Sequence, residues 1–527
     1  MTKKQKQKNN KTQTKGQKTL EKNEDKQSSA EETETLTITR PAGFRDFFPE
    51  DLHKVHFILQ TMRRISKEFG YVEYEAPTVE LLKLYEIKSG EGLVGETFKV
   101  ESRSGSELVL RPEMTPSLSR MLAEKQQSYT KPIRWFSLPK CYRDETLQRG
   151  RVKEFWQYNL DILGMDEVYA DAEVITILAK VIQACGLNNK QFVVLINDRE
   201  FMQQFIEGIG INDYLPILQT FDRKDKLLQE RIKKELSGPF SENDAEAIAI
   251  KIRHAKEIDE SIFEEIPKNA ATEQIVQDFS KLRKMAIINE LRGLGLTKKQ
   301  AEQLFELSEL IAQPKEFLDQ ARKIFPGNNI DKALNNLTEL AGFLEGFGIY
   351  DCCLYDGSLA RGLDYYTGII FEAWSREGIL SRAIAGGGRY ADLVATLGGQ
   401  PLTGTGFGFG ETVLMELLEE FNVEYPSPEI CDIYIAPIQL EDDPSPAIEL
   451  SVHLRRAGLS TVLNLFDWRI KRHFENAEKM GVRWMIIIGK RDLAEDSVTL
   501  RNIITGDQQK IPLSEIVKTA VEKIEEE

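Results

Sequence analysis

Residues 134–163 read RWFSLPKCYRDETLQRGRVKEFWQYNLDIL. Two apolar and aromatic segments, about 134–143 and 154–163, flank the polar loop Asp144–Lys153. This pattern predicts two antiparallel strands joined by a long hairpin loop. The stretch also bears on function, because its loop collects cations and its second strand collects polar side chains.

The hairpin carries four cations around one loop, namely Arg143, Arg149, Arg151 and Lys153. Arginine binds a phosphate through two N–H groups at once and lysine acts as a point charge, so this arrangement suits phosphate recognition. On the second strand, the period-two alternation places Gln157 and Asp161 on one face. For the loop alone, a solvated hairpin of mixed charge is the simpler interpretation.

Upstream of the hairpin, residues 110–115 read LRPEMT. Pro112 fixes the backbone, and Glu113 and Thr115 follow as two neighbouring acceptors. An ammonium group has three donors and no acceptor, so such a pair can hold it. A surface turn with a capping glutamate is the commoner explanation for these residues taken alone.

Residues 361–368 read RGLDYYTG and combine a fixed cation, Arg361, with the adjacent phenols of Tyr365 and Tyr366. A tyrosine hydroxyl both donates and accepts, which suits a neutral imidazole with one nitrogen of each kind. Glycines in a β-bulge and tyrosines in a core would explain the same letters without a ligand.

Two glycine-rich runs follow, AGGGRY at 385–390 and GTGFGFGE at 404–411. Glycine at this density lets the backbone approach a flat ligand closely. An amphipathic helix follows the second run, which superficially resembles a dinucleotide-binding fingerprint. The βαβ unit and the acidic residue about 20 positions further on are missing, so we set that interpretation aside.

Composition narrows the class of protein. The 527 residues include 69 Lys+Arg and 84 Asp+Glu, a net charge of −15, and 41% are hydrophobic. Apolar runs such as Trp484–Ile488 are far shorter than the ~18 residues of a membrane span, so no integral membrane protein is expected.

Five cysteines form no CxxC pair, which predicts neither a zinc ribbon nor a disulfide scaffold and fits the reducing cytosol. The acidic balance argues against bulk capture of nucleic acid but allows a local basic groove.

Changes of composition predict five segments. Residues 1–40 hold nine lysines and few apolar residues, which predicts a disordered tail that is neither a secretory signal nor a transit peptide. The remainder divides into a first core part at 41–198, a helical insertion at 199–342, a second core part at 343–426 and an α/β domain at 429–527. The insertion is expected because apolar residues recur at helical spacing through 214–236, 241–254, 272–294 and 298–324. In the last segment we expect strands at 431–436, 459–465 and 484–489 and helices at 444–457, 469–480 and 513–525, with a mostly parallel sheet.

In this order and spacing, the motifs resemble class II aminoacyl-tRNA synthetases, and specifically the histidyl-tRNA synthetase family. The segment Gly70–Pro77 is similar to the first class motif, the hairpin with Arg143 and Glu145 to the second, and residues 404–411 with their helix to the third. The runs 110–115 and 361–368 are similar to the two motifs typical of the histidine enzymes. The resemblance covers about 41–527 and implies an α+β fold. Its expected parts are an antiparallel sheet with flanking helices, a helical insertion and a C-terminal α/β anticodon-binding domain.

The resemblance implies a cytoplasmic, homodimeric histidine–tRNA ligase without an editing domain. Histidine would react with ATP to give histidyl-adenylate and pyrophosphate, and the histidyl group would then pass to the 3′ end of tRNA(His). Mg²⁺ would accompany ATP, with no zinc, no organic cofactor and no metal held by the protein. The implied catalytic residues are Arg361 and Arg143. Histidine would bind to Glu113, Thr115, Gln157, Asp161, Tyr365, Tyr366 and Tyr390, and ATP to Arg143, Glu145, Arg361, Gly408 and Gly410.

For tRNA, the resemblance implies contacts by the hairpin and by the C-terminal domain. That domain has 13 Lys+Arg and 18 Asp+Glu, a net charge of −5, so a local patch must provide them. The candidates are Arg149, Arg151, Arg469, Lys471, Arg472 and His473, with Phe466 and Trp468 able to stack on unpaired bases. A helix start with exposed cations would explain the C-terminal cluster equally well.

Two positions depart from the family pattern. Val413 stands where many class II enzymes have an arginine in the third motif, and Asp161 stands where some relatives have the longer glutamate. The missing arginine favours a rival, the regulatory subunit of ATP phosphoribosyltransferase, which resembles this core without being a synthetase. Arg361, the whole second motif and the C-terminal domain oppose that rival. Threonine, proline or glycine synthetases would not carry the 361–368 motif, and a structural RNA-binding protein would leave the polar pocket residues unexplained.

Overall fold

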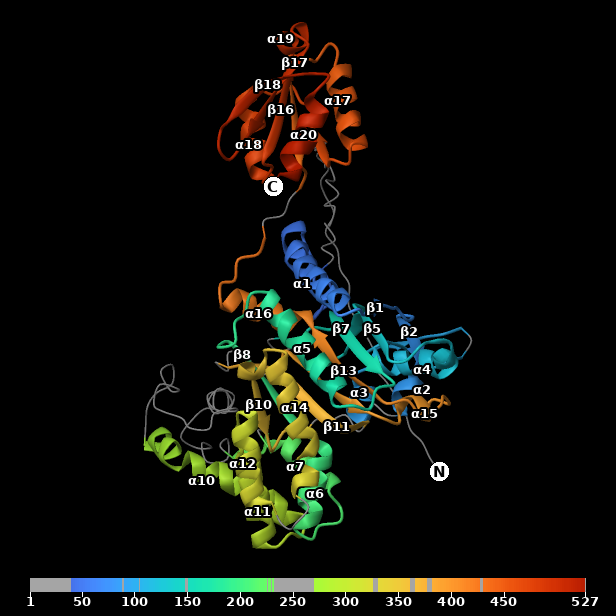
Figure 1. Ribbon diagram of the computed structural model, residues 1–527, viewed down its shortest axis with the longest axis vertical. Helices are drawn as coiled ribbons and strands as arrows, with labels where there is room; N and C mark the ends of the chain where they lie inside the picture. Colours follow the sequence, from blue (N-terminus) through green and yellow to red (C-terminus); the bar gives the residue numbers. More distant parts are fainter. Residues whose placement is uncertain are drawn as a thin grey trace, which may run out of the picture. The chain divides into compact units, whose positions relative to one another are not determined.

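A computed structural model of the chain is shown in Figure 1. It describes residues 39–87, 90–103, 105–146, 150–224, 226–228, 230–231, 270–325, 330–360, 365–376, 382–426 and 430–526. Residues 43–527 cluster as one compact unit. The predicted tail lies outside the described residues up to position 38, as does the predicted helical stretch 241–254.

The largest sheet has ten strands in the order β1-β5-β7-β13-β12-β11-β8-β10-β9, with β6 paired to β7. Its strands are β1 (Val72–Glu73), β5 (Ile133–Ser137), β6 (Lys140–Tyr142), β7 (Glu154–Leu163), β8 (Phe192–Asp198), β9 (Ile311–Ala312), β10 (Cys353–Asp356), β11 (Tyr366–Ser375), β12 (Ala385–Tyr390) and β13 (Gly404–Gly410). Every pairing along the path from β5 to β8 is antiparallel. The predicted antiparallel sheet of an α+β fold is therefore confirmed.

The hairpin forms, but its first arm is interrupted. The expected strand 134–143 is two short strands, β5 and β6, both paired with β7. Pro139 lies between them and has no N–H to donate to a ladder. Its carbonyl instead accepts from the Gln157 N–H at 2.8 Å, so β7 continues unbroken past the interruption.

Three helices pack together over the sheet: α1 (Pro49–Glu68), α5 (Tyr169–Ala184) and α16 (Glu411–Glu420) (Figure 1). In α1, Pro49 occupies the first turn, where its missing N–H costs nothing. Val55, Ile58 and Met62 recur on one face and are fully buried. Gly70, with φ +79°, ends the segment in a conformation that favours glycine.

A smaller sheet of order β2-β4-β3 stands beside the main one and introduces the 110–115 motif. Its strands are β2 (Val79–Leu81), β3 (Lys99–Val100) and β4 (Leu108–Leu110), with helices α2 (Leu82–Glu86), α3 (Gly90–Gly95), α4 (Thr115–Lys125) and α15 (Leu393–Thr396) nearby in the same layer. Because β4 ends at Leu110 and α4 begins at Thr115, Glu113 lies in the short connection between them.

The segment between β8 and β10 is mainly helical, as its periodicity predicts. Its described helices are α6 (Arg199–Gly208), α7 (Leu215–Asp222), α10 (Ala270–Gly293), α11 (Lys298–Glu309), α12 (Pro314–Ile324), α13 (Ile330–Ala333) and α14 (Asn335–Gly346). The helical spacing expected through 298–324 is interrupted once, by strand β9, which separates α11 from α12 and pairs with β10. Pro314 begins α12, since proline fits the first turn of a helix but cannot continue one.

The C-terminal segment forms its own five-stranded sheet of order β15-β14-β16-β17-β18. Its elements are β14 (Ile433–Ile438), α17 (Ser445–Arg456), β15 (Thr461–Leu463), α18 (Ile470–Lys479), β16 (Trp484–Gly489), α19 (Lys490–Ala494), β17 (Ser497–Asn502), β18 (Gln508–Pro512) and α20 (Ile516–Glu525). The first three strands are parallel, as predicted. The hairpin β17–β18 was not expected, and it adds two antiparallel strands.

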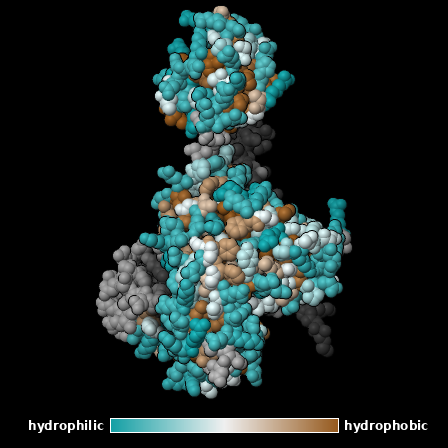
Figure 2. Space-filling model, viewed as in Figure 1, coloured by the Kyte–Doolittle hydropathy of each residue, from teal (hydrophilic) through white to brown (hydrophobic). Residues whose placement is uncertain are grey.

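Within the described parts of the chain, no helix has both the length and the apolar character needed to cross a membrane. The face seen in Figure 2 is mostly hydrophilic, with hydrophobic residues scattered among polar ones. All five cysteines are buried as free thiols.

One buried ion pair ties a covering helix to the centre of the sheet. Asp171 of α5 is fully buried and accepts from Arg389 of β12, at 2.9 Å from Nε to Oδ2 and 2.5 Å from Nη2 to Oδ2. The same guanidinium donates to the carbonyls of Met165 and Glu167 at 2.9 Å each. One side chain thus connects β12, α5 and the turn before α5.

We predict that Asp171→Ala lowers the free energy of unfolding by about 3–5 kcal/mol, because it leaves a buried guanidinium without its counter-ion. Urea unfolding at pH 7 measures the change. The control is Glu68→Ala, which breaks the exposed Arg64–Glu68 pair within α1 and should cost less than about 1 kcal/mol. Equal losses for the two variants would contradict this account.

Candidate active site

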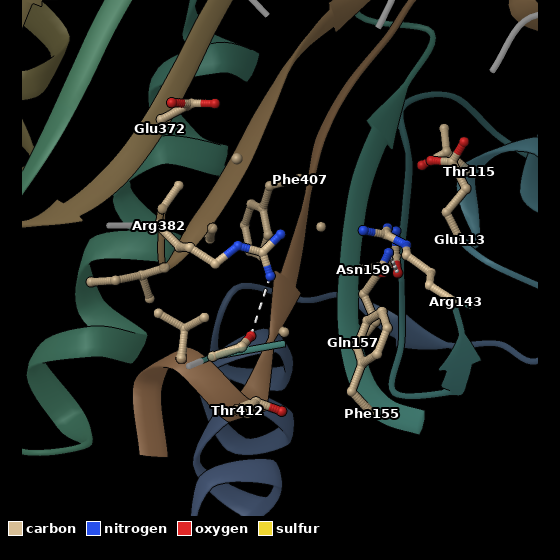
Figure 3. A pocket seen from close by; sticks show the side chains of 18 of the residues that line it. Glu113, Thr115, Arg143, Phe155, Gln157, Asn159, Glu372, Arg382, Phe407 and Thr412 are labelled. Atoms are coloured by element: carbon tan, nitrogen blue, oxygen red, sulfur yellow. Dashed lines mark hydrogen bonds between the residues drawn. The ribbon is translucent and has the colours of Figure 1, made fainter. Parts of the chain in front are cut away.

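A cavity of about 390 Å³ opens on the polar face of the main sheet. Its walls come from β7, β11, β12, β13, the β4–α4 connection and the hairpin loop, as Figure 3 shows in part. The structure brings twelve predicted residues to this one cavity: Glu113, Thr115, Arg143, Glu145, Arg151, Gln157, Asp161, Tyr365, Tyr366, Tyr390, Gly408 and Gly410. Arg361 and Arg149 lie outside the described residues, so their placement stays a prediction.

Strand β7 supplies the polar floor. Its alternation points Phe155, Gln157, Asn159 and Asp161 to the cavity, as predicted for Gln157 and Asp161. In the neighbouring strand β13, glycines stand opposite these side chains, with Gly406 paired to Asp161 and Gly408 to Asn159.

The glycines of β13 are required by space. A Cβ on Gly406 would lie 2.1 Å from Asp161 Oδ1, and one on Gly408 would lie 3.0 Å from Gln157 Nε2. Any larger residue at 406 would therefore displace the carboxylate. The glycine density noted in the sequence makes room for the protein's own polar side chains.

Asp161 is the most unusual group in the cavity. Its carboxyl is 2% exposed, and Oδ1 accepts from the Tyr390 hydroxyl at 2.8 Å. Oδ2 is buried and has no hydrogen-bond partner among the described residues. Burial raises the pKa of Asp161 to about 7, the Tyr390 hydrogen bond opposes this, and the nearby Glu113 carboxylate adds to it. A buried acceptor of this kind is suited to an N–H donor from a ligand.

Around Asp161 the cavity combines phenols with a second carboxylate. The Tyr365 ring lies 4.8 Å from that of Tyr366 and 5.9 Å from that of Tyr390, measured between centroids. The Tyr365 hydroxyl donates to Glu113 Oε2 at a long 3.5 Å, and Glu113 is 5% exposed. Two buried carboxylates flanked by three phenols form a small polar chamber that a compact cationic or N–H-rich ligand would fill.

The other half of the cavity gathers guanidinium groups. Arg143 Nε donates to the Pro112 carbonyl at 3.0 Å, and its Cζ lies 5.3 Å from the centre of the Phe155 ring. Glu145 is nearly buried and is shared by three arginines, Arg151 at 2.7 Å, Arg382 at 3.5 Å and Arg143 at 3.9 Å. This half therefore presents more N–H donors than its carboxylate can accept, which suits a polyanion.

Arg382 was missed by the sequence analysis. It belongs to no strand, helix or periodic pattern, and stands just before the glycine-rich strand β12. The one signal was its position, a cation beside a glycine run that was already linked to ligand binding. Glu372, Trp374 and Thr412 also line the cavity and were not expected.

Described residues on both sides of Arg361 are held by residues of β8 and of the helical segment. Asn197 Nδ2 donates to the Leu359 carbonyl at 3.1 Å, and Arg199 Nη1 donates to the Tyr366 carbonyl at 2.9 Å. Lys224 approaches Asp356 at 3.8 Å. The described flanks of Arg361 are thus fixed, and Tyr365 among them faces the cavity.

The C-terminal candidates form a surface cluster on their own domain. The Phe466 and Trp468 rings stack with centroids 5.1 Å apart and 11° between planes, and Arg472 Cζ lies 4.3 Å from the Trp468 ring centre. Phe466 is 65% exposed. Arg469 immediately precedes α18, and Lys471 in its first turn is also exposed.

His473 is a wrong assignment. Its side chain is fully buried, and its Nδ1 lies 3.0 Å from the Tyr434 hydroxyl, so it does not face a ligand in solution. The physical reason is helical spacing, because His473 and Ala477 lie four residues apart on the face of α18 that packs inward.

Among the described residues, no group of three or more His, Cys, Asp or Glu side chains could hold a metal ion.

Comparisons with known proteins agree with the geometry. A family model described as histidyl-tRNA synthetase matches residues 43–248 and 241–412, and one described as an anticodon binding domain matches 432–523. The histidine–tRNA ligase of Pyrococcus furiosus is 32% identical over 482 residues, covering 91% of this chain and 98% of that relative. The histidine–tRNA ligase of Leptospira biflexa is 28% identical over 498 residues, covering 93% and 98%.

Solved structures show the same fold. Histidyl-tRNA synthetase from Nostoc sp. PCC 7120 superposes with a TM-score of 0.69 at 20% identity, covering 93% of this chain and all of that one. A Bacillus halodurans protein described as an ATP phosphoribosyltransferase regulatory subunit/histidyl-tRNA synthetase gives 0.61 at 22% identity, covering 86% and 98%. At these identities the structures establish the fold alone.

The raised pKa of Asp161 predicts a pH-dependent loss of stability. The unfolded carboxyl titrates near 3.8 and the folded one near 7, so the native state holds the extra proton between these values. The free energy of unfolding should therefore fall as pH rises from about 4 to 7, and Asp161→Asn should remove that fall. Between pH 4 and pH 8, the free energy of unfolding of the variant should rise by roughly 2–4 kcal/mol relative to that of the wild type.

Urea unfolding at several pH values measures this difference. Asp319→Asn serves as the control, because the Asp319 side chain is 76% exposed and should show no such gain. A stability difference between wild type and Asp161→Asn that is independent of pH would show that the buried carboxyl titrates normally.

Proposed function

The chain belongs to the histidyl-tRNA synthetase family, and we propose that its central cavity is where histidine and ATP react. The protein is accordingly a histidine–tRNA ligase. In the first step an oxygen of the histidine carboxylate attacks the α-phosphorus of ATP, and the bond to pyrophosphate breaks. In the second, a ribose hydroxyl at the 3′ end of tRNA attacks the histidyl carbonyl, and AMP leaves.

The unpartnered oxygen of Asp161 is the observation that carries the assignment of this cavity to histidine. In the proposal it accepts from one imidazole N–H, and Tyr366 serves the other ring nitrogen. Tyr390 holds Oδ1 and so fixes the carboxylate, while Tyr365 packs against both phenols. An amino acid without two ring nitrogens would leave buried groups unpaired, which gives strong rejection without an editing site.

The α-amino group is assigned to Glu113, Thr115 and Gln157. Glu113 supplies a nearly buried carboxylate within reach of the Tyr365 hydroxyl, and Thr115 starts α4 two residues later. Gln157 Nε2 donates to Asn159 Oδ1 at 2.8 Å, which leaves its carbonyl oxygen to accept from the ammonium group. The three acceptors match the three N–H donors of an ammonium group.

The reacting phosphate is assigned to Arg143, with Arg361 on its other side. Arg143 is anchored by its Nε, so its terminal N–H groups can hold the α-phosphate and the histidine carboxylate together. No nucleophilic side chain is required, because the carboxylate of histidine is itself the nucleophile. The protein contributes positioning and charge neutralisation.

The nucleotide is assigned to the guanidinium half of the cavity. Glu145 would contact the adenine or the RNA end, and Gly408 and Gly410 would let the base approach the β13 backbone. Mg²⁺ would enter with ATP as part of the substrate, because phosphate oxygens are among its preferred ligands.

For tRNA, we assign the exposed cluster of Phe466, Trp468, Arg469, Lys471 and Arg472 to unpaired anticodon bases, and Arg149 and Arg151 to the acceptor end. Stacked aromatic rings beside an arginine are suited to single-stranded bases. We also propose a cytoplasmic location and a homodimer. The homodimer is supported by the sheet edge at β1, where Val72 is 62% exposed and can meet a second chain.

Pyrophosphate exchange into ATP, run without tRNA and with each of the twenty amino acids, tests the assignment. Only histidine should support exchange. Asp161→Asn should raise the KM for histidine at least tenfold and leave the KM for ATP nearly unchanged, because it replaces an acceptor by a donor in the imidazole subsite.

Two results would contradict the proposal. A folded protein that exchanges with no amino acid would support the regulatory-subunit rival, and a defect of Asp161→Asn confined to ATP would place the histidine site elsewhere. Thermal unfolding of the same samples establishes that each is folded.

The tRNA assignment predicts a separation of the two steps. Phe466→Ala should raise the KM for tRNA(His) in aminoacylation by roughly tenfold, since stacking of one base contributes ~1–3 kcal/mol, while pyrophosphate exchange stays unchanged. Ile504→Ala is the matched control, because Ile504 is a similarly exposed apolar side chain of the same domain, at 71% against 65% for Phe466. Equal effects of the two substitutions would remove Phe466 from the tRNA-binding surface.

A further inference from the structure

The first turn of α16 brings no cation to the cavity. Val413 lines the cavity with an apolar side chain that is 7% exposed. Glu411, two residues earlier, is fully buried and paired with Arg45. The nucleotide half of the site therefore depends on cations from other elements.

Arg382 reaches the same place from a different strand connection. A Cβ built on Gly150 would lie 3.6 Å from Val413 Cγ2 and 3.7 Å from Arg382 Cδ, so the two side chains converge on one point beside the hairpin loop. Figure 3 shows Arg382 and Arg143 reaching toward the middle of the cavity from opposite sides. Arg382 thus brings a charge to the region that Val413 leaves apolar.

The contacts of Arg382 are too few and too long to satisfy it. Its Nη1 donates to the Gly150 carbonyl at 3.3 Å, and its Nη2 lies 3.5 Å from Glu145 Oε2. These are its hydrogen-bond acceptors among the described residues, and a guanidinium has five N–H donors. Glu145 is meanwhile held more closely by Arg151, at 2.7 Å.

The charges around Arg382 favour an anionic ligand. Burial lowers the pKa of Arg382 to about 10, with repulsion by Arg151 and Arg143 opposed by attraction to Glu145 and Glu96. Three guanidinium groups packed beside one another repel, and a polyanion between them would relieve that repulsion. A neutral base would not.

We propose that Arg382 binds the β- and γ-phosphates of ATP, and so supplies from the β12 side the cation that position 413 lacks. This inference rests on the proposed function of the cavity. Arg143 then faces the reacting α-phosphate, and Arg382 faces the pyrophosphate that leaves. Arg382 is therefore a residue that binds the ATP substrate in the step that activates histidine.

The test is pyrophosphate exchange by Arg382→Ala with histidine present, with the concentrations of ATP and pyrophosphate varied in turn. The KM values for ATP and for pyrophosphate should each rise roughly ten- to hundredfold, as expected when a charge-assisted contact to phosphate is lost. The KM for histidine should change less than threefold. Adenosine, which has no phosphate, should inhibit wild type and variant with the same inhibition constant.

Arg134→Ala is the matched control. Its side chain is 26% exposed, as is that of Arg382, and it is ion-paired to Glu173 outside the cavity. Its KM for ATP should stay at the wild-type value. Arg382→Lys keeps the charge but not the fork of donors, so its defect should be smaller than that of Arg382→Ala, and it serves as the test variant if the alanine variant does not fold.

Val413→Arg in the Arg382→Ala background adds a positional test. Because the two side chains converge beside Gly150, an arginine at 413 should recover at least tenfold of the lost affinity for ATP. Direct titration with ATP in the absence of histidine gives the same ranking of affinities without relying on turnover.

The outcomes separate this inference from the proposed function. Wild-type protein without histidine-dependent exchange overturns the proposed function. Active wild type with an unchanged KM for ATP and for pyrophosphate in Arg382→Ala overturns the role of Arg382 alone. An inhibition constant for adenosine that rises as much as the KM for ATP also overturns it, because the contact would then be to the base.

Discussion

The close approach of β13 to β7 is the constraint on which the active site depends. Asp161 occupies the space that a side chain at position 406 would need, with only 2.1 Å between its Oδ1 and a Cβ built there. The next strand, β12, also requires glycine, since a Cβ on Gly387 would lie 2.2 Å from the Gly406 carbonyl oxygen. Strands of glycine are weak formers of sheet, because they lose much backbone entropy and pack no side chains. The helices packed over the sheet and the Asp171–Arg389 pair compensate by holding these strands from the other side.

The sequence predicted the parts of the site that obey a local rule. Alternation along one strand placed Gln157 and Asp161 together. The close approach of a flat ligand to the glycines of β13 stays a prediction, and in the structure Gly406 and Gly408 make room for Asp161 and Gln157. The sequence also predicted the antiparallel hairpin and the helical character of the segment after β8. These features depend on residues that are close together in the sequence, so the sequence alone predicts them.

The remainder depended on contacts between distant residues. Arg382 carries no pattern, and its importance comes from meeting Glu145 and Val413 across the fold. His473 has the chemistry of a surface ligand, yet its helical phase turns it inward toward Tyr434. Strand β9 is only two residues long, too short for a periodic signal, and exists because β10 offers it an edge. Arg361, the strongest functional candidate by resemblance, lies outside the described residues, so its role stays a prediction.

The lone oxygen of Asp161 has a consequence for the life of the protein as well as for its chemistry. An interior acceptor without a donor lowers the stability of the empty protein, and a ligand that supplies the donor restores that free energy when it binds. Bound histidine therefore raises the free energy of unfolding of the protein. When histidine is scarce, more of the protein is ligand-free, unfolds more often and is more readily degraded.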